Sequence, residues 1–144
     1  MQRESNMAAK RVRIPRGEEK EDVYRRKEIL IRELLPLIGT KVKCPALNNR
    51  DVEFIFYSID ETATRAARRY QTTLVALHVK EAIRVAKLKR KGTPKSSRQR
   101  KMQFQRVYEL HGKLKELGEY KLIVGEKKNK RVLHYCITSK KADK

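Results

Sequence analysis

The architecture expected of this chain follows from two β-rich runs, GEYKLIVG at residues 118–125 and RVLHYCIT at residues 131–138. The polar run EKKNK separates them, and two strands around a short polar turn predict a β-hairpin. The second run carries His134, the one histidine expected on a strand, close to tyrosine, threonine, arginine and lysine. If the protein carries out chemistry, this hairpin is where we expect it.

The register of the hairpin depends on its turn. A turn at residues 126–130 pairs Gly125 with Arg131 and sets Leu122 opposite His134. A turn one residue shorter would shift that pairing between the strands. Side chains alternate between two faces along each strand, so the grouping within one strand is the same for either turn.

Two faces follow from this alternation. His134 and Thr138 share one face of their strand, and Tyr120 is expected on the same side of the neighbouring strand. Three apolar residues fall on the opposite face: Ile123, Leu133 and Ile137. We therefore expect the apolar face to pack against helices, and the face with Tyr120, His134 and Thr138 to form an open surface.

Periodicity elsewhere predicts three helices and a second hairpin. Apolar residues at helical spacing predict helices over about residues 19–37, 58–90 and 102–117. Strands at residues 41–44 and 52–57 flank a turn rich in asparagine and form the second hairpin. The fold class is therefore α+β, with a small antiparallel sheet of about four strands, arranged as two hairpins, packed against three helices.

The length of 144 residues suits one domain with a modest core, and the sequence shows no internal repeat. Residues 1–17 lack apolar periodicity and are expected to form a disordered basic arm. Residues 18–139 form the single α+β domain, and residues 140–144 form a polar tail.

Cysteine usage and hydropathy bear on the compartment. Cys44 and Cys136 are far apart and lack the spacing of metal ligands or of a disulfide framework. No apolar run approaches membrane-spanning length, and the N-terminus lacks the apolar core of a signal peptide. These features favour the cytoplasm, with a virion-associated location as the alternative, and no membrane partner.

Charge gives the main functional signal. Lysine and arginine total 37 against 17 acids, for a formal net charge of +20, which favours a polyanionic partner. Residues 87–106 contain no acid, and glycine, proline and serine make their middle a loop. We expect this stretch to clamp phosphates beside a groove, with a solvated linker as the alternative. The expected nucleic-acid-binding residues are Lys87, Lys89, Arg90, Lys91, Lys95, Arg98, Arg100 and Lys101.

The last hairpin holds the parts that metal-independent RNA cleavage needs. His134 could act as acid or base, Tyr120 could orient or donate, and Thr138 could bind a phosphate oxygen. Arg131 and Lys121 could stabilise the phosphate charge. No metal or cofactor is expected, because the sequence has no glycine-rich phosphate loop, no Cys/His cluster and only scattered carboxylates.

The pattern Gly-x-Tyr-Lys-Leu-Ile-Val-Gly, a short basic turn and then His-Tyr-x-Ile-Thr resembles the C-terminal hairpin of phage-encoded members of the barnase–EndoU–colicin–RelE nuclease superfamily. The resemblance covers roughly residues 41–139. It implies a compact α+β domain with a four-stranded antiparallel sheet and metal-independent RNase activity. It also implies that His134 and Thr138 face the substrate, with Lys121 or Arg131 as phosphate contacts.

We therefore expect a nucleic-acid-binding protein, with RNA favoured, that acts as a metal-independent ribonuclease of phage or mobile-element origin. The alternatives are a non-catalytic nucleic-acid-binding protein and a virion or assembly component. The second alternative would add a protein partner or a larger phage assembly to the nucleic acid.

Overall fold

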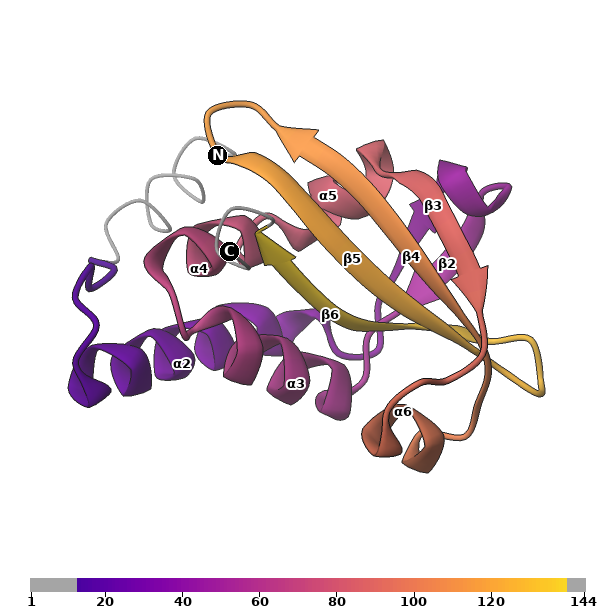
Figure 1. Cartoon of the computed structure of the whole chain (residues 1–144), viewed down its shortest axis with the longest axis horizontal. Helices are drawn as coiled ribbons and strands as arrows, with labels where there is room; N and C mark the ends of the chain where they lie inside the picture. The colour runs from indigo at the N-terminus through magenta and orange to yellow at the C-terminus, as the bar shows by residue number, and fades with distance from the viewer. Residues whose placement is uncertain (1–12, 140–144) are drawn as a thin grey trace.

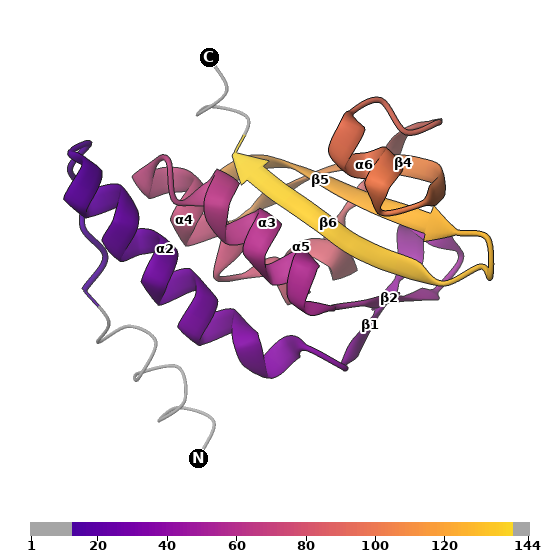
Figure 2. The same ribbon diagram turned by 90° about the horizontal axis from the view of Figure 1, so that it is seen from below.

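The computed structural model describes residues 13–139, and they form a curled mixed sheet with helices on both faces (Figures 1 and 2). The strands are β1 (Lys41–Cys44), β2 (Arg50–Glu53), β3 (Lys87–Gly92), β4 (Phe104–Leu114), β5 (Gly118–Lys127) and β6 (Val132–Ser139). The helices are α2 (Lys20–Leu34), α3 (Phe56–Ala66), α4 (Tyr70–Ala76), α5 (Val79–Val85) and α6 (Ser97–Lys101). Short 3-10 helices follow α2 and β1, at Leu35–Leu37 and Pro45–Leu47.

The strand order is β1-β2-β6-β5-β4-β3. All neighbours pair antiparallel except β2 and β6, which pair in parallel through Val52–Val132 and Glu53–Leu133. The two predicted hairpins, β1–β2 and β5–β6, are confirmed as strand pairs. Beyond Leu133, β6 has no strand on the β2 side, and α3 runs beside it there (Figure 2).

The α+β class is confirmed, but the expected sheet of four strands with three helices is wrong. The described residues hold six strands and five α-helices. The region predicted as a helix over 102–117 is β4, and the end of the long helix is β3. The strand expected at 52–57 ends at Glu53, because α3 already begins at Phe56.

The error at β4 has a simple physical origin. Its buried side chains, Phe104, Tyr108, Leu110 and Leu114, follow the two-residue period of a strand with one irregularity near Arg106. The same segment also has apolar residues at spacings of three and four, which predicted a helix. β4 pairs along its length with β5, which spans ten residues from Gly118 to Lys127. This pairing between strands overrides the local helical pattern.

The long helix expected over 58–90 is divided into α3, α4 and α5. At the first break, side chains donate to carbonyls between the end of α3 and the start of α4. Arg26 Nε donates to Ala67 O at 2.8 Å, and Thr73 Oγ1 donates to Ala66 O at 3.0 Å and Arg69 O at 2.8 Å. Ala66 O also accepts from the backbone N–H of Arg69, and Arg69 O from that of Thr73, so the side chains add to the backbone hydrogen bonds at this break.

Arg26 is a fully buried side chain that also holds the N-terminal segment, which we define as residues 13–17. Its Nη1 donates to Pro15 O and Gly17 O, each at 2.7 Å. The N-terminal segment forms no helix or strand. Residues 1–12 of the predicted arm and the predicted tail at 140–144 lie outside the described residues.

The main core lies between α2–α5 and one face of the sheet, which we call the inner face. A smaller cluster lies on the opposite, outer face, beneath α6, and contains Phe104, Leu133, Tyr135 and Cys136. Away from α6, the outer face of β3, β4 and β5 carries no helix (Figure 2). This uncovered sheet surface, together with the edge of β6, positions the candidate site.

Candidate nucleic-acid interface

A β-bulge in β6 changes which side chains share a face. Ile123 pairs with Cys136 and Val124 pairs with His134, so Tyr135 is an additional residue between two ladder positions. Leu122 therefore lies opposite Ile137, and the predicted pairing of Leu122 with His134 is wrong. His134 follows Val124 to the inner face, while Thr138 pairs with Lys121 on the outer face.

The expected open surface of Tyr120, His134 and Thr138 is wrong, because two of the three are core residues. His134 is 1% exposed, its Nε2 lies 2.6 Å from Thr62 Oγ1, and its ring packs against Phe54. Burial lowers the pKa of His134 to about 3, so the ring is neutral at pH 7. A neutral ring enclosed in the core cannot reach a phosphodiester.

Tyr120 is likewise buried, and its hydroxyl donates to Ala82 O at 2.5 Å. Burial raises the pKa of Tyr120 to about 12. This contact joins β5 to α5, which is a structural role.

Arg131 lies apart from the other predicted catalytic residues, at the start of β6. Its Nη2 contacts Glu53 Oε1 at 2.7 Å and its Nε also donates to that carboxylate. The pair lowers the pKa of Glu53 and ties the last hairpin to β2. Of the five predicted catalytic residues, the structure brings Lys121 and Thr138 together on the outer face.

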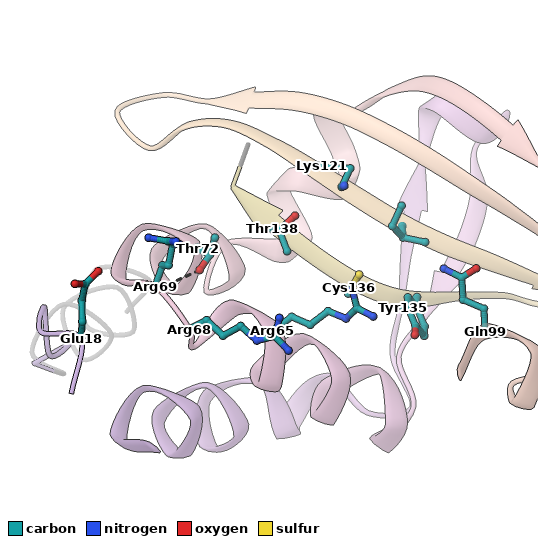
Figure 3. A pocket seen from close by; sticks show the side chains of 11 residues that line it. Glu18, Arg65, Arg68, Arg69, Thr72, Gln99, Lys121, Tyr135, Cys136 and Thr138 are labelled. Carbon is teal, nitrogen blue, oxygen red and sulfur yellow. Dashed lines mark hydrogen bonds between the residues drawn. The ribbon is translucent and has the colours of Figure 1, made fainter. Parts of the chain in front are cut away.

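Lys121 and Thr138 line a hollow of about 520 Å³ that we call the β6 groove (Figure 3). The strands β5 and β6 form one wall. The segment from the end of α3 to the start of α4 forms the other, with Arg65, Arg68 and Arg69. In Figure 3 the Arg65 side chain extends toward Cys136 of β6, and Arg69 lies beside Thr72 at the turn between α3 and α4. Gln99 of α6 lies toward one end and Glu18 toward the other.

The three arginines differ in their electrostatic surroundings. Arg65 forms an ion pair with Glu61, whose side chain is 2% exposed and also binds Arg98 Nη1 at 2.8 Å. The Arg65 guanidinium lies 5.6 Å from the centroid of the Tyr135 ring. Within residues 13–139, the side chains of Arg68 and Arg69 form no ion pair with an acid. Both are exposed at the groove, so their charges are available to an incoming anion.

The predicted phosphate clamp is distributed over three kinds of structure. Lys87, Lys89, Arg90 and Lys91 lie on β3, an exposed edge strand. The remaining residues lie on the following loop and on α6: Lys95, Arg98, Arg100 and Lys101. The loop expected in the middle of this stretch is limited to residues 93–96, between β3 and α6, and of the basic residues Arg98 is tied to Glu61.

Sequence reasoning missed the arginines of the groove and a histidine on the sheet surface. The run RAARRY at residues 65–70 lies in the middle of the helix expected over 58–90, where it gives no sign of a site. His111, expected on a helix, lies on β4, and its Nε2 is 2.6 Å from Glu109 Oε2. His111 pairs with Lys121 across the sheet, so the His111–Glu109 pair lies on the outer face beside the β6 groove.

Other site classes receive no support from the part of the chain that the structure describes. Residues 13–139 hold no group of three or more histidine, cysteine, aspartate or glutamate side chains that could bind a metal ion. None of their helices combines the length and the hydrophobicity that a membrane crossing requires. No protein-family model, curated protein or solved structure matches this chain, so the nuclease resemblance stays a prediction.

Proposed function

We propose that the protein binds nucleic acid, with RNA favoured, in the β6 groove. One observation carries the proposal: Arg68 and Arg69, without acidic partners among the described residues, line a hollow of about 520 Å³ together with Lys121 and Thr138. One guanidinium group can donate two hydrogen bonds to the oxygens of a phosphate, and a threonine hydroxyl can add one more. The net charge of +20 would draw a polyanion toward this site.

The other lining residues suit a nucleotide better than inorganic phosphate alone. The half-buried Ile123 gives the groove an apolar part, and Gln99 and Thr72 supply hydrogen-bonding groups. A base could lie against the apolar part while its phosphate contacts the arginines. Contacts to the phosphate would supply affinity, and those to the base could supply preference among bases.

Fluorescence anisotropy with a labelled single-stranded RNA tests this proposal. The Arg68→Ala/Arg69→Ala variant should bind at least about tenfold more weakly, and the salt slope should fall by about 1.4 for two lost phosphate contacts on a single strand. The control is Arg25→Ala/Arg84→Ala, which removes the same charge from exposed positions on α2 and α5. Equal losses in the two variants would contradict a groove-specific site.

A second candidate function, RNA cleavage, is favoured by the His111–Glu109 pair. Histidine is the usual acid or base near neutral pH, and the hydrogen bond to Glu109 orients its ring. Both side chains are about one-fifth exposed, and Lys121 lies opposite His111 on the neighbouring strand. A phosphate in the β6 groove would therefore lie close to an acid–base pair.

Incubation of labelled RNA in chelator tests cleavage separately from binding. The wild-type protein should cut the RNA, and His111→Gln should abolish cutting while RNA affinity changes less than about twofold. His78→Gln, which alters an exposed histidine before α5, is the matched control. A wild-type protein that binds but does not cut would support the non-catalytic alternative. Equal affinity for RNA, DNA and heparin would favour an assembly role.

A further inference from the structure

The β6 groove continues at one end into a larger hollow. This second hollow, of about 700 Å³, shares Glu18 and Arg69 with the β6 groove. It extends past Tyr70 to Lys113, near the β4–β5 turn. The Arg16 guanidinium lies 4.9 Å from the centroid of the Tyr70 ring at its border. The two hollows are therefore joined at the turn between α3 and α4.

At its other end the β6 groove continues toward β3. A small hollow of about 70 Å³ shares Gln99 and Ile123 with it and is bordered by Arg90 and Lys95. These two residues belong to the basic stretch that the sequence singled out. The three hollows thus lie end to end, from β3 past α6, along β6 and on to the N-terminal segment.

Cations outnumber acids in each of the three hollows. Glu109 is the one acid bordering the small hollow, against Arg90 and Lys95. Glu18 is the one acid of the β6 groove, which has four cations. Glu18 and Glu116 border the second hollow, together with Arg16, Arg26, Arg69 and Lys113. The charge is therefore spread along a line, as it would be for a partner with regularly spaced phosphates.

We propose that these three hollows form one path for an extended single strand of nucleic acid. The inference rests on the proposed function and adds that the bound form is single-stranded and spans several nucleotides. Hollows of about 520 and 700 Å³ are large enough to enclose nucleotide-sized groups. A duplex has its bases paired internally and would contact the rims, so the apolar floor would remain unused.

The walls also carry surfaces on which bases can stack. The half-buried Tyr70 ring lies beside Arg16 in the second hollow, and the half-buried Ile123 gives the β6 groove an apolar surface near its cations. Single-strand binders combine such stacking surfaces with a positive groove that follows the backbone. A strand in this path could therefore alternate phosphate contacts with stacked bases.

A length series of labelled RNA oligonucleotides tests the path. Lengths from about 2 to about 12 nucleotides cover the usual site sizes of single-strand binders. Affinity of the wild-type protein should rise with length until the strand occupies all three hollows and then level off. A duplex of the longest sequence should bind at least about tenfold more weakly than its single strand at the same salt concentration.

Variants at the two ends make the test specific. Arg90→Ala/Lys95→Ala and Arg16→Ala/Lys113→Ala should each weaken the longest oligonucleotide about fivefold or more and leave the shortest unchanged. Arg68→Ala/Arg69→Ala should weaken every length, and Arg25→Ala/Arg84→Ala should weaken none by more than about twofold. A duplex that binds as tightly as the single strand, or end variants that weaken all lengths equally, would overturn the path but leave binding in the β6 groove intact. Absence of binding at every length would reject the proposed function itself.

Discussion

Because His134 is buried, we expect it to affect how the stability of the fold depends on pH, and not to take part in catalysis. Its ring lies against Phe54, and Nε2 hydrogen-bonds Thr62, with no route to solvent. The perturbation is a change from pH 7 to pH 5, applied to the wild-type protein and to His134→Gln. Glutamine is uncharged at both values, and its amide can replace the hydrogen bond to Thr62.

The magnitude follows from the difference in pKa between the folded and unfolded states. An unfolded histidine has a pKa of about 6.5, whereas burial lowers that of His134 to about 3. Because the folded pKa is lowered, the unfolded chain takes up the proton first as the pH falls below 6.5. Stability is therefore complete above that value and is lost progressively toward pH 3. Between pH 7 and pH 5 the loss is about 2 kcal/mol from this residue alone.

Urea denaturation followed by far-UV circular dichroism at both pH values measures this loss. The free energy of unfolding of the wild-type protein should fall by about 2 kcal/mol more than that of His134→Gln. Carboxylates with lowered pKa, such as Glu53 and Glu126, contribute equally to both proteins and cancel in the comparison. His78→Gln should behave like the wild type, since His78 is exposed. An equal fall in wild type and His134→Gln would show that the ring is not enclosed as described.

Three further predictions concern the frame around the groove. Arg26→Met should lower the free energy of unfolding by about 3–5 kcal/mol in urea titration, because it leaves buried carbonyls unpaired. A loss below about 1 kcal/mol would contradict the role assigned to Arg26. Gly125→Ala should lower the free energy of unfolding by about 1–3 kcal/mol, because the added Cβ would overlap the Phe104 ring. Gly92→Ala is the control: it has open space around it and should change that free energy by no more than about 0.5 kcal/mol. Lys130→Gly should raise the free energy of unfolding by about 1 kcal/mol, and with it the melting temperature, because it relieves a positive φ of 74°. An unchanged or lower melting temperature would show that the turn is unstrained.

Local patterns predicted the elements that carry a clear signal of their own. The last hairpin, α2 and β1 lie where the sequence placed them, because apolar alternation or helical spacing is unambiguous there, whereas β2 overlaps the expected strand only at Val52 and Glu53. The bulge at Tyr135 has no such signal. It is stabilised by neighbours distant in sequence, namely the edge-on ring of Phe104 and the guanidinium of Arg65. This one additional residue places His134 and Thr138 on opposite faces of the sheet.

The division of the long helix was equally hidden. No glycine or proline lies between Ser58 and Arg90, so the sequence offers no local reason for a break. The break depends on Arg26, which reaches carbonyls at Ala67 and Arg68 from a helix about forty residues earlier. The corner that presents Arg68 and Arg69 to the groove is therefore created by tertiary contacts, and the site could not be assembled from local propensity.

The position of β6 also has a consequence for the order of folding. In the described sheet β6 is the strand that links β1–β2 with β3–β4–β5, so these two parts cannot pair with each other until residues 132–139 dock. Val52 must then find Val132 across eighty positions of chain, and contacts of such long separation slow the rate-limiting step. Until that docking, the edges of β2 and β5 are unpaired and open to other chains. The basic edge strand β3, whose like charges repel a second copy, would limit association at the outer end of the larger piece during this interval.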